Sequence, residues 1–227
     1  MKNKIFYIIY DNLKTLIGAL LIALLIRSLL YQPFYIPSSS MEPTLLVGDR
    51  IFVSKYTYGY SRHSFPFSPN FSNKRFFSKI PERGDLVVFK TPADNRTDYI
   101  KRLIGMPGDT IQFVNGDLLI NGNKIQRDKV ASTKVIRCGN FKLETQSFIE
   151  TLPNGTKYLA VYKKRGTLQN TKKFIVPSDH FFLMGDNRDC SKDSRYLNSV
   201  GYVNNLNLVG EAQLIFFSND TNISSLL

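Results

Sequence analysis

A cluster of serines and a lysine further along the chain have the residue types needed for acyl-transfer chemistry. The serines stand in the segment PSSSMEPTL at 37–45, and the lysine stands in DYIKR at 98–102. A serine hydroxyl is a poor nucleophile at neutral pH, so it needs an adjacent base and donors that stabilise the oxyanion. This pattern indicates Ser40 as a nucleophile and Lys101 as its base.

The base must be a lysine or a carboxylate, because neither histidine has a catalytic context. His63 lies in a Ser/Pro/Phe-rich stretch and His180 follows a turn-like PSD, so both are expected at the surface. A lysine is a base only when neutral, so its pKa must fall by about 2–3 units from about 10.4. Burial in an apolar pocket would lower the pKa of Lys101 in this way, although most lysines in such strands are solvated.

The element that leads to the serine cluster is an almost wholly apolar stretch at 13–31. A membrane span needs about 17–25 such residues, and Arg27, near the far end, can snorkel to the interface. The preceding charges are Lys2, Lys4, Asp11 and Lys14. Their positive balance predicts residues 1–12 as a cytoplasmic tail and 32–227 as a domain on the outer side. We expect an uncleaved signal anchor; a cleavable signal peptide and a soluble core helix are the alternatives.

After the anchor, the sequence predicts a mainly β domain. Short runs rich in β-branched and aromatic residues are expected as strands at 50–53, 85–89, 99–104, 110–114, 118–120, 158–162, 181–184 and 212–217. Asn-Gly pairs at 115–116 and 121–122 predict hairpin turns. Residues 60–80 are expected to form a loop whose phenylalanines either contact lipid or pack inward. Residues 125–175 are expected to form an inserted smaller lobe.

The composition narrows the classes of partner. A net charge of +12 over 227 residues fits an anionic membrane surface, or reflects a general abundance of lysine. Zinc-finger spacing and the aromatic signature of an RNA-recognition sheet are both missing, so no nucleic-acid partner is expected. The sequence has no cluster with metal-ligand spacing, and no metal or cofactor is expected. Whether Cys138 and Cys190 pair is left open.

Four segments, taken together, resemble the bacterial type I signal peptidases, the leader peptidases with a serine–lysine dyad. They occur in the order of that family behind the anchor: YQPFYIPSSSMEPTL at 31–45, RGDLVVF at 83–89, DYIKRLIGMPGD at 98–109 and MGDNRDCSKDSR at 184–195. The resemblance implies the β fold shared by signal peptidases and self-cleaving repressors. It also implies an endopeptidase that removes signal peptides at small-x-small sites through an acyl-enzyme.

The same resemblance assigns roles to individual residues. Ser40 is similar to the nucleophile and Lys101 to the general base, with Tyr99 beside the base. The Ser38 hydroxyl and the Ser40 N–H match the oxyanion donors. Three further residues match supporting positions: Ser191, which would orient the lysine ammonium, and the ion pair of Asp193 and Arg195. The implied partners are secretory preproteins and the lipid bilayer of the inner membrane, with a monomeric enzyme facing the periplasmic side.

Two residues depart from the family pattern. Ser39 stands where the family often has glycine, and Cys190 stands where it usually has asparagine. The second departure makes Cys190 a poor candidate for a structural disulfide.

Other functions remain as alternatives. A self-cleaving repressor would be cytoplasmic with a DNA-binding domain, and the β-lactamase and α/β-hydrolase motifs are not found. A non-catalytic, membrane-anchored basic β-domain that binds anionic lipid or envelope proteins is the alternative from another class. It predicts that Ser40 can be replaced without loss.

Overall fold

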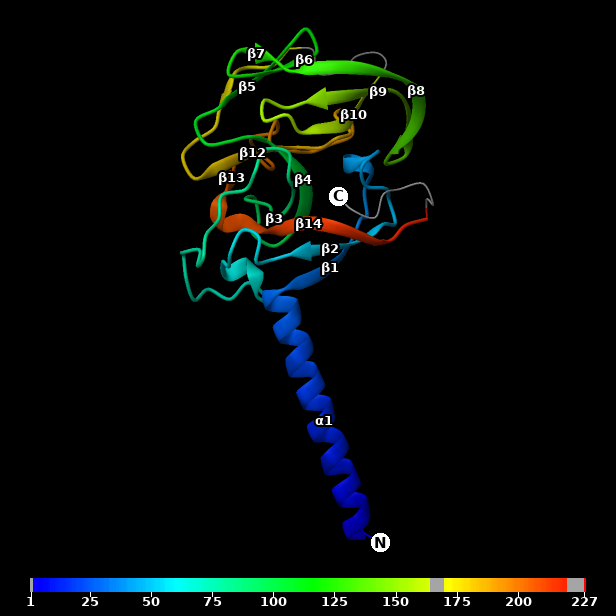
Figure 1. Ribbon diagram of the computed structural model, residues 1–227, viewed down its shortest axis with the longest axis vertical. Helices are drawn as coiled ribbons and strands as arrows, with labels where there is room; N and C mark the ends of the chain where they lie inside the picture. The colour runs from blue at the N-terminus through cyan, green and yellow to red at the C-terminus, as the bar shows by residue number, and fades with distance from the viewer. Residues whose placement is uncertain (1, 164–169, 220–226) are drawn as a thin grey trace.

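A single long helix, α1 (Lys2–Leu29), carries a domain built almost entirely of strands (Figure 1). The computed structural model describes residues 2–163, 170–219 and 227. Between Tyr7 and Leu29 the helix is long and apolar enough to cross a membrane, and none of its most apolar stretch is buried by the protein. The predicted bounds of 13–31 need correction, because the helix starts earlier and Tyr31 already pairs with Ser54 in a strand.

The domain is organised around a seven-stranded antiparallel sheet next to the anchor. The first strand in the sheet contains Pro33, which has no backbone N–H. The sheet tolerates this because the strand lies at its edge. In sheet order the strands are β1 (Tyr31–Tyr35), β2 (Arg50–Ser54), β14 (Leu208–Phe217), β3 (Leu86–Lys90), β4 (Asp98–Gly105), β12 (His180–Met184) and β13 (Val203–Asn204). The mainly β fold class predicted from the sequence is confirmed.

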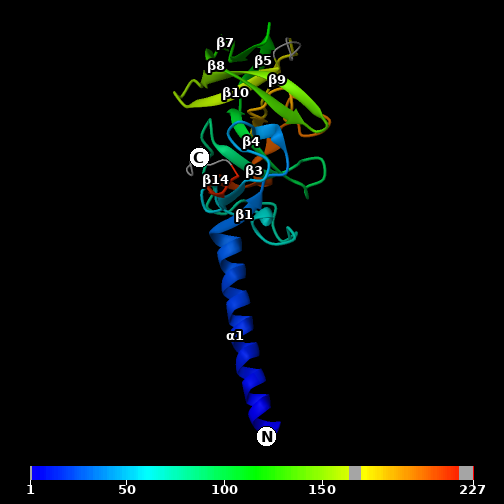
Figure 2. The same ribbon diagram turned by 90° about the vertical axis from the view of Figure 1, so that its right-hand side faces the viewer.

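Two smaller sheets lie at the end of the domain far from α1 (Figures 1 and 2). One has the order β11 (Phe174–Ile175), β5 (Thr110–Val114), β6 (Asp117–Ile120) and β7 (Asn123–Lys124). The other has the order β10 (Lys157–Lys163), β9 (Phe141–Thr151) and β8 (Gln126–Cys138). Asn115, Gly116, Asn121 and Gly122 all have positive φ, so the two predicted Asn-Gly hairpin turns are confirmed.

The core consists of three apolar clusters. Two lie against the large sheet, one including Ile51 and Val88 and the other including Phe89 and Leu103. The third joins β12 to the two small sheets through Phe182. The third cluster also contains Ile104 of β4, so the outer sheets are packed onto the strand that carries the lysine.

The segment 60–80 adjoins the upper end of α1 (Figure 1). It contains the short helix η2 (Arg62–Ser64) and a bridge between Tyr60 and Phe76. Phe67 and Phe77 are almost fully exposed, so inward packing is wrong for these two side chains. Contact with lipid stays a prediction.

A buried ion pair links the three-stranded sheet to the segment that follows β12. Arg188 Nη2 lies 2.7 Å from Glu150 Oε2 on β9, and both side chains are at most 1% exposed. The guanidinium also donates to the hydroxyls of Tyr158 and Tyr162 on β10, both at 2.7 Å. The sheet within residues 125–175 is therefore fixed to the 184–195 segment by charge as well as by apolar packing.

Removal of Arg188 should leave the Glu150 carboxylate buried without a charged partner. We predict that Arg188→Met lowers the free energy of unfolding by about 3–5 kcal/mol. Lys124→Met is the control, because Lys124 pairs with Asp117 but is 61% exposed, and its loss should cost at most about 1 kcal/mol. Urea unfolding of the full chain in detergent, followed by circular dichroism, checks this; equal losses in both variants would contradict it.

Candidate active site

The serine cluster lies in a short helical turn that follows β1. Ser39, Ser40 and Met41 form the 3₁₀ helix η1 (Ser39–Met41), and all three are buried. Ser38 precedes the turn and is exposed. Because a 3₁₀ helix leaves its first N–H groups without intrahelical acceptors, the backbone N–H of Ser40 is free to bind an external group.

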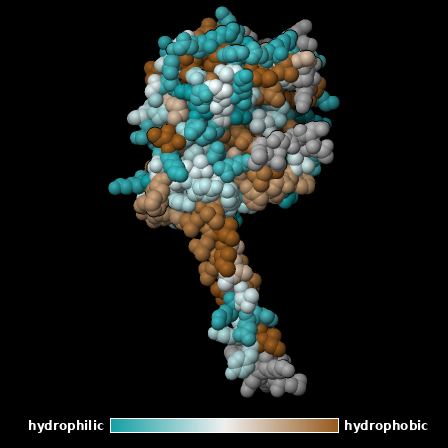
Figure 3. Space-filling view, in the orientation of Figure 1, coloured by the Kyte–Doolittle hydropathy of each residue, from teal (hydrophilic) through white to brown (hydrophobic). Residues whose placement is uncertain are grey.

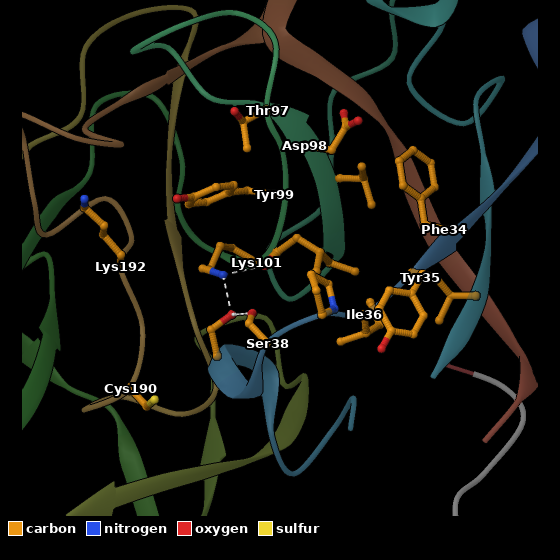
Figure 4. Close-up of a pocket in the computed structure, with 15 residues that line it drawn as sticks. Phe34, Tyr35, Ile36, Ser38, Thr97, Asp98, Tyr99, Lys101, Cys190 and Lys192 are labelled. Carbon is orange, nitrogen blue, oxygen red and sulfur yellow. Dashed lines mark hydrogen bonds between the residues drawn. The ribbon is translucent and has the colours of Figure 1, made fainter. Parts of the chain in front are cut away.

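Lys101 lies on β4 and points at Ser40 (Figure 4). Its Nζ is 2.7 Å from Ser40 Oγ and 2.8 Å from the carbonyl oxygen of Ile100. The Tyr99 ring centroid is 5.4 Å from the same amine. The structure therefore brings together the serine, the lysine and the tyrosine that were selected from the sequence.

The environment of Lys101 favours its neutral form. The side chain is only 3% exposed. Burial lowers the pKa of Lys101 to about 8, and the negative charges of Asp193 and Asp186 oppose this shift only in part. A neutral amine beside Ser40 Oγ can accept the proton of the hydroxyl.

Two hydrogen-bond donors lie beside the Ser40 hydroxyl. Ser38 Oγ is 3.3 Å from Ser40 Oγ, on the side open to solvent. Among the described residues, no hydrogen bond uses the backbone N–H of Ser40. A hydroxyl and an unused N–H beside Ser40 are donors of the kind that bind the oxygen of a tetrahedral adduct.

The residues that hold these groups in place were not selected from the sequence. The Asp186 carboxylate accepts Arg102 Nε at 2.8 Å and Nη2 at 2.7 Å, and it accepts the Thr44 hydroxyl at 2.6 Å. Asn187 donates to the carbonyls of Ser39 and Ser40, at 3.1 and 3.2 Å. The sequence indicates a structural role for Arg102, because it shares a strand face with Ile100 and Ile104 and needs a partner there. Nothing in the sequence indicates such a role for Thr44.

The ion pair of Asp193 and Arg195 is buried, so an exposed salt bridge is ruled out. Arg195 Nε lies 2.7 Å from Asp193 Oδ1, and the side chains are 3% and 0% exposed. Burial alone would raise the pKa of Asp193, but the charge and hydrogen bonds of Arg195 outweigh it and lower the pKa. The carboxylate also accepts the Gly185 N–H at 3.0 Å, which fixes the turn beside Ser40.

Ser191 forms no hydrogen bond with Lys101 in the described part of the chain. Its buried hydroxyl forms no hydrogen bond of ordinary geometry, although it helps to lower the pKa of Asp193. The described partners of Lys101 Nζ are Ser40 and Ile100. That Ser191 orients the lysine therefore stays a prediction, and among the described residues the carbonyl of Ile100 is the other hydrogen-bond partner of the amine.

A cavity of about 410 Å³ opens in front of Ser40 and Lys101 (Figure 4). Its apolar walls come from four strands, β1 to β4, and from the segment after β1, and they include Ile36, Ile51, Val88 and Ile100. Tyr99 and Cys190 line the part nearest the serine. The site is therefore an open apolar groove that ends at a serine and a buried amine.

A comparison with known proteins decides the family. The family model described as signal peptidase, peptidase S26, matches residues 9–217. Signal peptidase I of Rickettsia typhi is 44% identical over 208 residues, which are 87% of this chain and 76% of that protein. The chain belongs to the signal peptidase family, peptidase S26. The predicted family and enzyme class are confirmed, and with them signal peptide removal as the activity.

A further relative agrees with this membership. Signal peptidase I of Rickettsia canadensis is 46% identical over 208 residues, 87% of this chain and 76% of that protein. Among solved structures, a signal peptidase I from Enterococcus faecalis is 26% identical in sequence to this chain and superposes on it with a TM-score of 0.36. The match covers 59% of this chain and 97% of that one.

The two departures from the family pattern meet in the structure of this signal peptidase. Cys190 forms a disulfide with Cys138, at the end of β8, with the two Cα atoms 5.5 Å apart. The assessment of Cys190 as a poor candidate for a disulfide was wrong, because the β8–β9 hairpin folds back over the 184–195 segment. Ser39 Oγ lies 3.4 Å from Cys190 Sγ, so the extra hydroxyl faces the bridge.

The histidines take no part in this site of the peptidase. His63 is 4% exposed, so its predicted place at the surface is wrong; its Nδ1 lies 2.9 Å from Ser68 Oγ. Burial, followed by the charge of Arg62, lowers the pKa of His63 to about 4. His180 is half-buried, and neither ring lines the cavity. Within the described part of the chain, no group of His, Cys, Asp and Glu could hold a metal ion.

The disulfide should stabilise the peptidase through the loop that it closes. With the two cysteines 52 residues apart, the chain-entropy relation predicts that Cys138→Ser lowers the free energy of unfolding by about 4 kcal/mol. Urea unfolding of the full chain checks this, with reduced wild type as the matched control. An unchanged unfolding midpoint, or two free thiols in the unreduced protein, would contradict the bridge.

Proposed function

We propose that this signal peptidase cleaves preproteins with Ser40 as nucleophile and Lys101 as general base. The observation that carries the proposal is the 2.7 Å hydrogen bond between Lys101 Nζ and Ser40 Oγ in a buried site. The lowered pKa of Lys101 supports it, because an amine with its ordinary pKa would be protonated at neutral pH and could not act as a base.

The reaction would proceed in two balanced steps. Ser40 Oγ attacks the scissile carbonyl while Lys101 Nζ accepts its proton, and the Ser40 N–H and Ser38 hydroxyl bind the oxyanion. Collapse breaks the peptide bond, and the proton on Lys101 passes to the leaving amine. Water then attacks the acyl-enzyme while Lys101 takes a proton from it. As the ester bond to Ser40 breaks, that proton passes to Ser40 Oγ, and the signal peptide leaves with a free carboxylate.

The substrate would bind as an added strand along β4. The β3 side of β4 is paired from Asp98 to Arg102, whereas β12 pairs with β4 only from Arg102 onward. No other described strand covers the remaining edge from Asp98 to Lys101, so its backbone can bind an extended peptide. The cavity walls formed by Ile36, Val88 and Ile100 would leave room for small apolar side chains, which supports cleavage at small-x-small sites.

The anchor supports a position on the outer side of the inner membrane. Lys2, Lys4 and Lys14 precede or begin the apolar part of α1, so we propose that the N-terminus is cytoplasmic and that residues 32–227 face the periplasmic side. Ser40 and Lys101 come from one chain, so a monomer would hold the whole dyad. Preproteins held in the bilayer by their signal peptides would meet the groove close to the membrane.

Loss of either dyad member should abolish cleavage without unfolding the protein. Ser40→Ala and Lys101→Ala are each expected to lower kcat for a preprotein with a small-x-small site by about 10³-fold or more. The exposed residues Ser178 and Lys142 give matched controls, Ser178→Ala and Lys142→Ala, which should cleave normally. If Ser40→Ala retains near-normal cleavage, the nucleophile is assigned wrongly, and a non-catalytic lipid-binding domain becomes the better account.

Cleavage should be lost as the pH falls through the pKa of Lys101. That pKa is lowered to about 8, so the neutral base predominates above pH 8 and the inactive ammonium predominates below it. We expect kcat/KM at pH 6 to be about 100-fold below its plateau, since a pH two units below the pKa leaves about 1% of the amine neutral. A rate that is independent of pH between about 5 and 9 would exclude a lysine base.

A further inference from the structure

A second pocket lies where the chain leaves the membrane-spanning helix. It has a volume of about 850 Å³ and is lined by Leu24 and Arg27 of α1, by part of the 60–80 segment, and by the turn between β3 and β4. Two hydrogen bonds of 2.8 Å hold the residues around this pocket next to the end of α1. The Lys55 N–H donates to the Leu30 carbonyl, and the Tyr60 hydroxyl donates to the Leu29 carbonyl. We call this space the anchor-side pocket.

The anchor-side pocket has an excess of positive charge. Its lining contains five cationic side chains and two carboxylates, which are Arg27, Lys55, Arg62, Lys90, Arg96, Asp94 and Asp98. Asp98 pairs with Lys90 at 2.8 Å, and Asp94 accepts hydrogen bonds within its own turn. In the described part of the chain, Arg27, Arg62 and Arg96 form no ion pair. The pocket therefore has cations available for an anionic ligand.

Lys55 likewise forms no ion pair in the described part of the chain, although the charge of Asp98 acts on it from a greater distance. Its side chain is 2% exposed, and its ammonium donates to the Ser64 carbonyl although it can donate three hydrogen bonds. Burial first, and then the positive charge of Arg27, lowers the pKa of Lys55 to about 8. A phosphate group in the pocket would supply both the missing negative charge and the missing acceptors.

The surroundings of the pocket indicate a ligand that carries acyl chains. Leu24 belongs to the part of α1 that no protein segment covers. Phe67 also lines the pocket and is fully exposed. Hydrophobic side chains lie on the part of the domain that adjoins the anchor (Figure 3). A soluble phosphate would leave these apolar groups in water, whereas a phospholipid would cover them.

We propose that the anchor-side pocket binds the phosphate headgroup of an anionic phospholipid from the leaflet in which α1 ends, with its acyl chains along Leu24 and Phe67. Bound lipid would fix the height and tilt of the domain on the membrane. The binding does not depend on the dyad, because Ser40 and Lys101 line the other cavity. Phe34 and Asp98 line both spaces, so the lipid would sit behind one wall of the groove.

Native mass spectrometry of the full chain in mild detergent tests this site directly. The protein is offered equal amounts of dioleoyl phosphatidylglycerol and dioleoyl phosphatidylcholine, and retained lipid is counted. We expect wild type to retain phosphatidylglycerol with about tenfold or greater preference, since each Lys or Arg near a membrane surface contributes about 1 kcal/mol to anionic lipid binding. Equal retention of both lipids would overturn the proposal, whatever the variants show.

Two triple variants locate the binding. Arg27→Gln, Arg62→Gln and Arg96→Gln together should remove the preference. Lys124→Gln, Arg137→Gln and Lys142→Gln remove the same charge from exposed positions on β7, β8 and β9 and should preserve it. If both triple variants lose the preference for phosphatidylglycerol equally, the attraction is non-specific, and this would overturn the pocket as the binding site. If millimolar inorganic phosphate displaces the lipid, the pocket binds free phosphate, and the proposal that its ligand is a phospholipid would be overturned.

Discussion

The catalytic geometry depends on one buried carboxylate, that of Asp186. It accepts hydrogen bonds from Arg102, next to the lysine on β4, and from Thr44, which follows the serine turn. Three segments far apart in sequence therefore meet at one charge that is 0% exposed. A buried ion pair costs desolvation of both groups, and loss of either partner would leave a charge stranded in the core. Stability and the placement of the serine are thus tied to the same interaction.

The close packing around this carboxylate explains the glycine beside it. A Cβ on Gly185 would collide with Ser191 and with the carbonyl of Ser40. The turn that contains Asp186 can therefore approach Ser40 only without a side chain at position 185. Asn187 then clamps the serine turn from the same segment, through the carbonyls of Ser39 and Ser40. The serine is held by its backbone, which leaves its hydroxyl available to Lys101.

Much of the fold could be predicted from the sequence, because its strands are apolar, β-branched and closed by Asn-Gly turns. β1 was missed since it is short and contains Pro33, and its partner β2 is required to define it. The β8–β9 hairpin was read only as a polar lobe, because few of its residues are buried. Its disulfide could not be foreseen, since Cys138 and Cys190 meet only when this hairpin folds over the 184–195 segment.

Some residues of the candidate site could likewise be selected from the sequence, and others could not. Ser40, Lys101 and Ser38 stand in segments whose residue types indicate chemistry, and the structure brings them together. The supports depend on tertiary packing: Thr44 and Asn187 carry no pattern of their own, and their contacts to Asp186 and to the serine turn join segments far apart in the sequence. His63 was expected at the surface because its neighbours are Ser, Pro and Phe, but it is a buried residue of η2 whose ring lies against Ser68.

The central claim is that burial lowers the pKa of Lys101 to about 8, so that enough of its amine is neutral near neutral pH to activate Ser40. The most direct test is an NMR titration of full-length protein in detergent with ¹³C-labelled lysine, in which Lys101→Arg and Lys55→Arg assign the two buried amines. The account predicts that the Lys101 resonance titrates with a midpoint of about 8. A midpoint at the ordinary value of about 10.4 would contradict it.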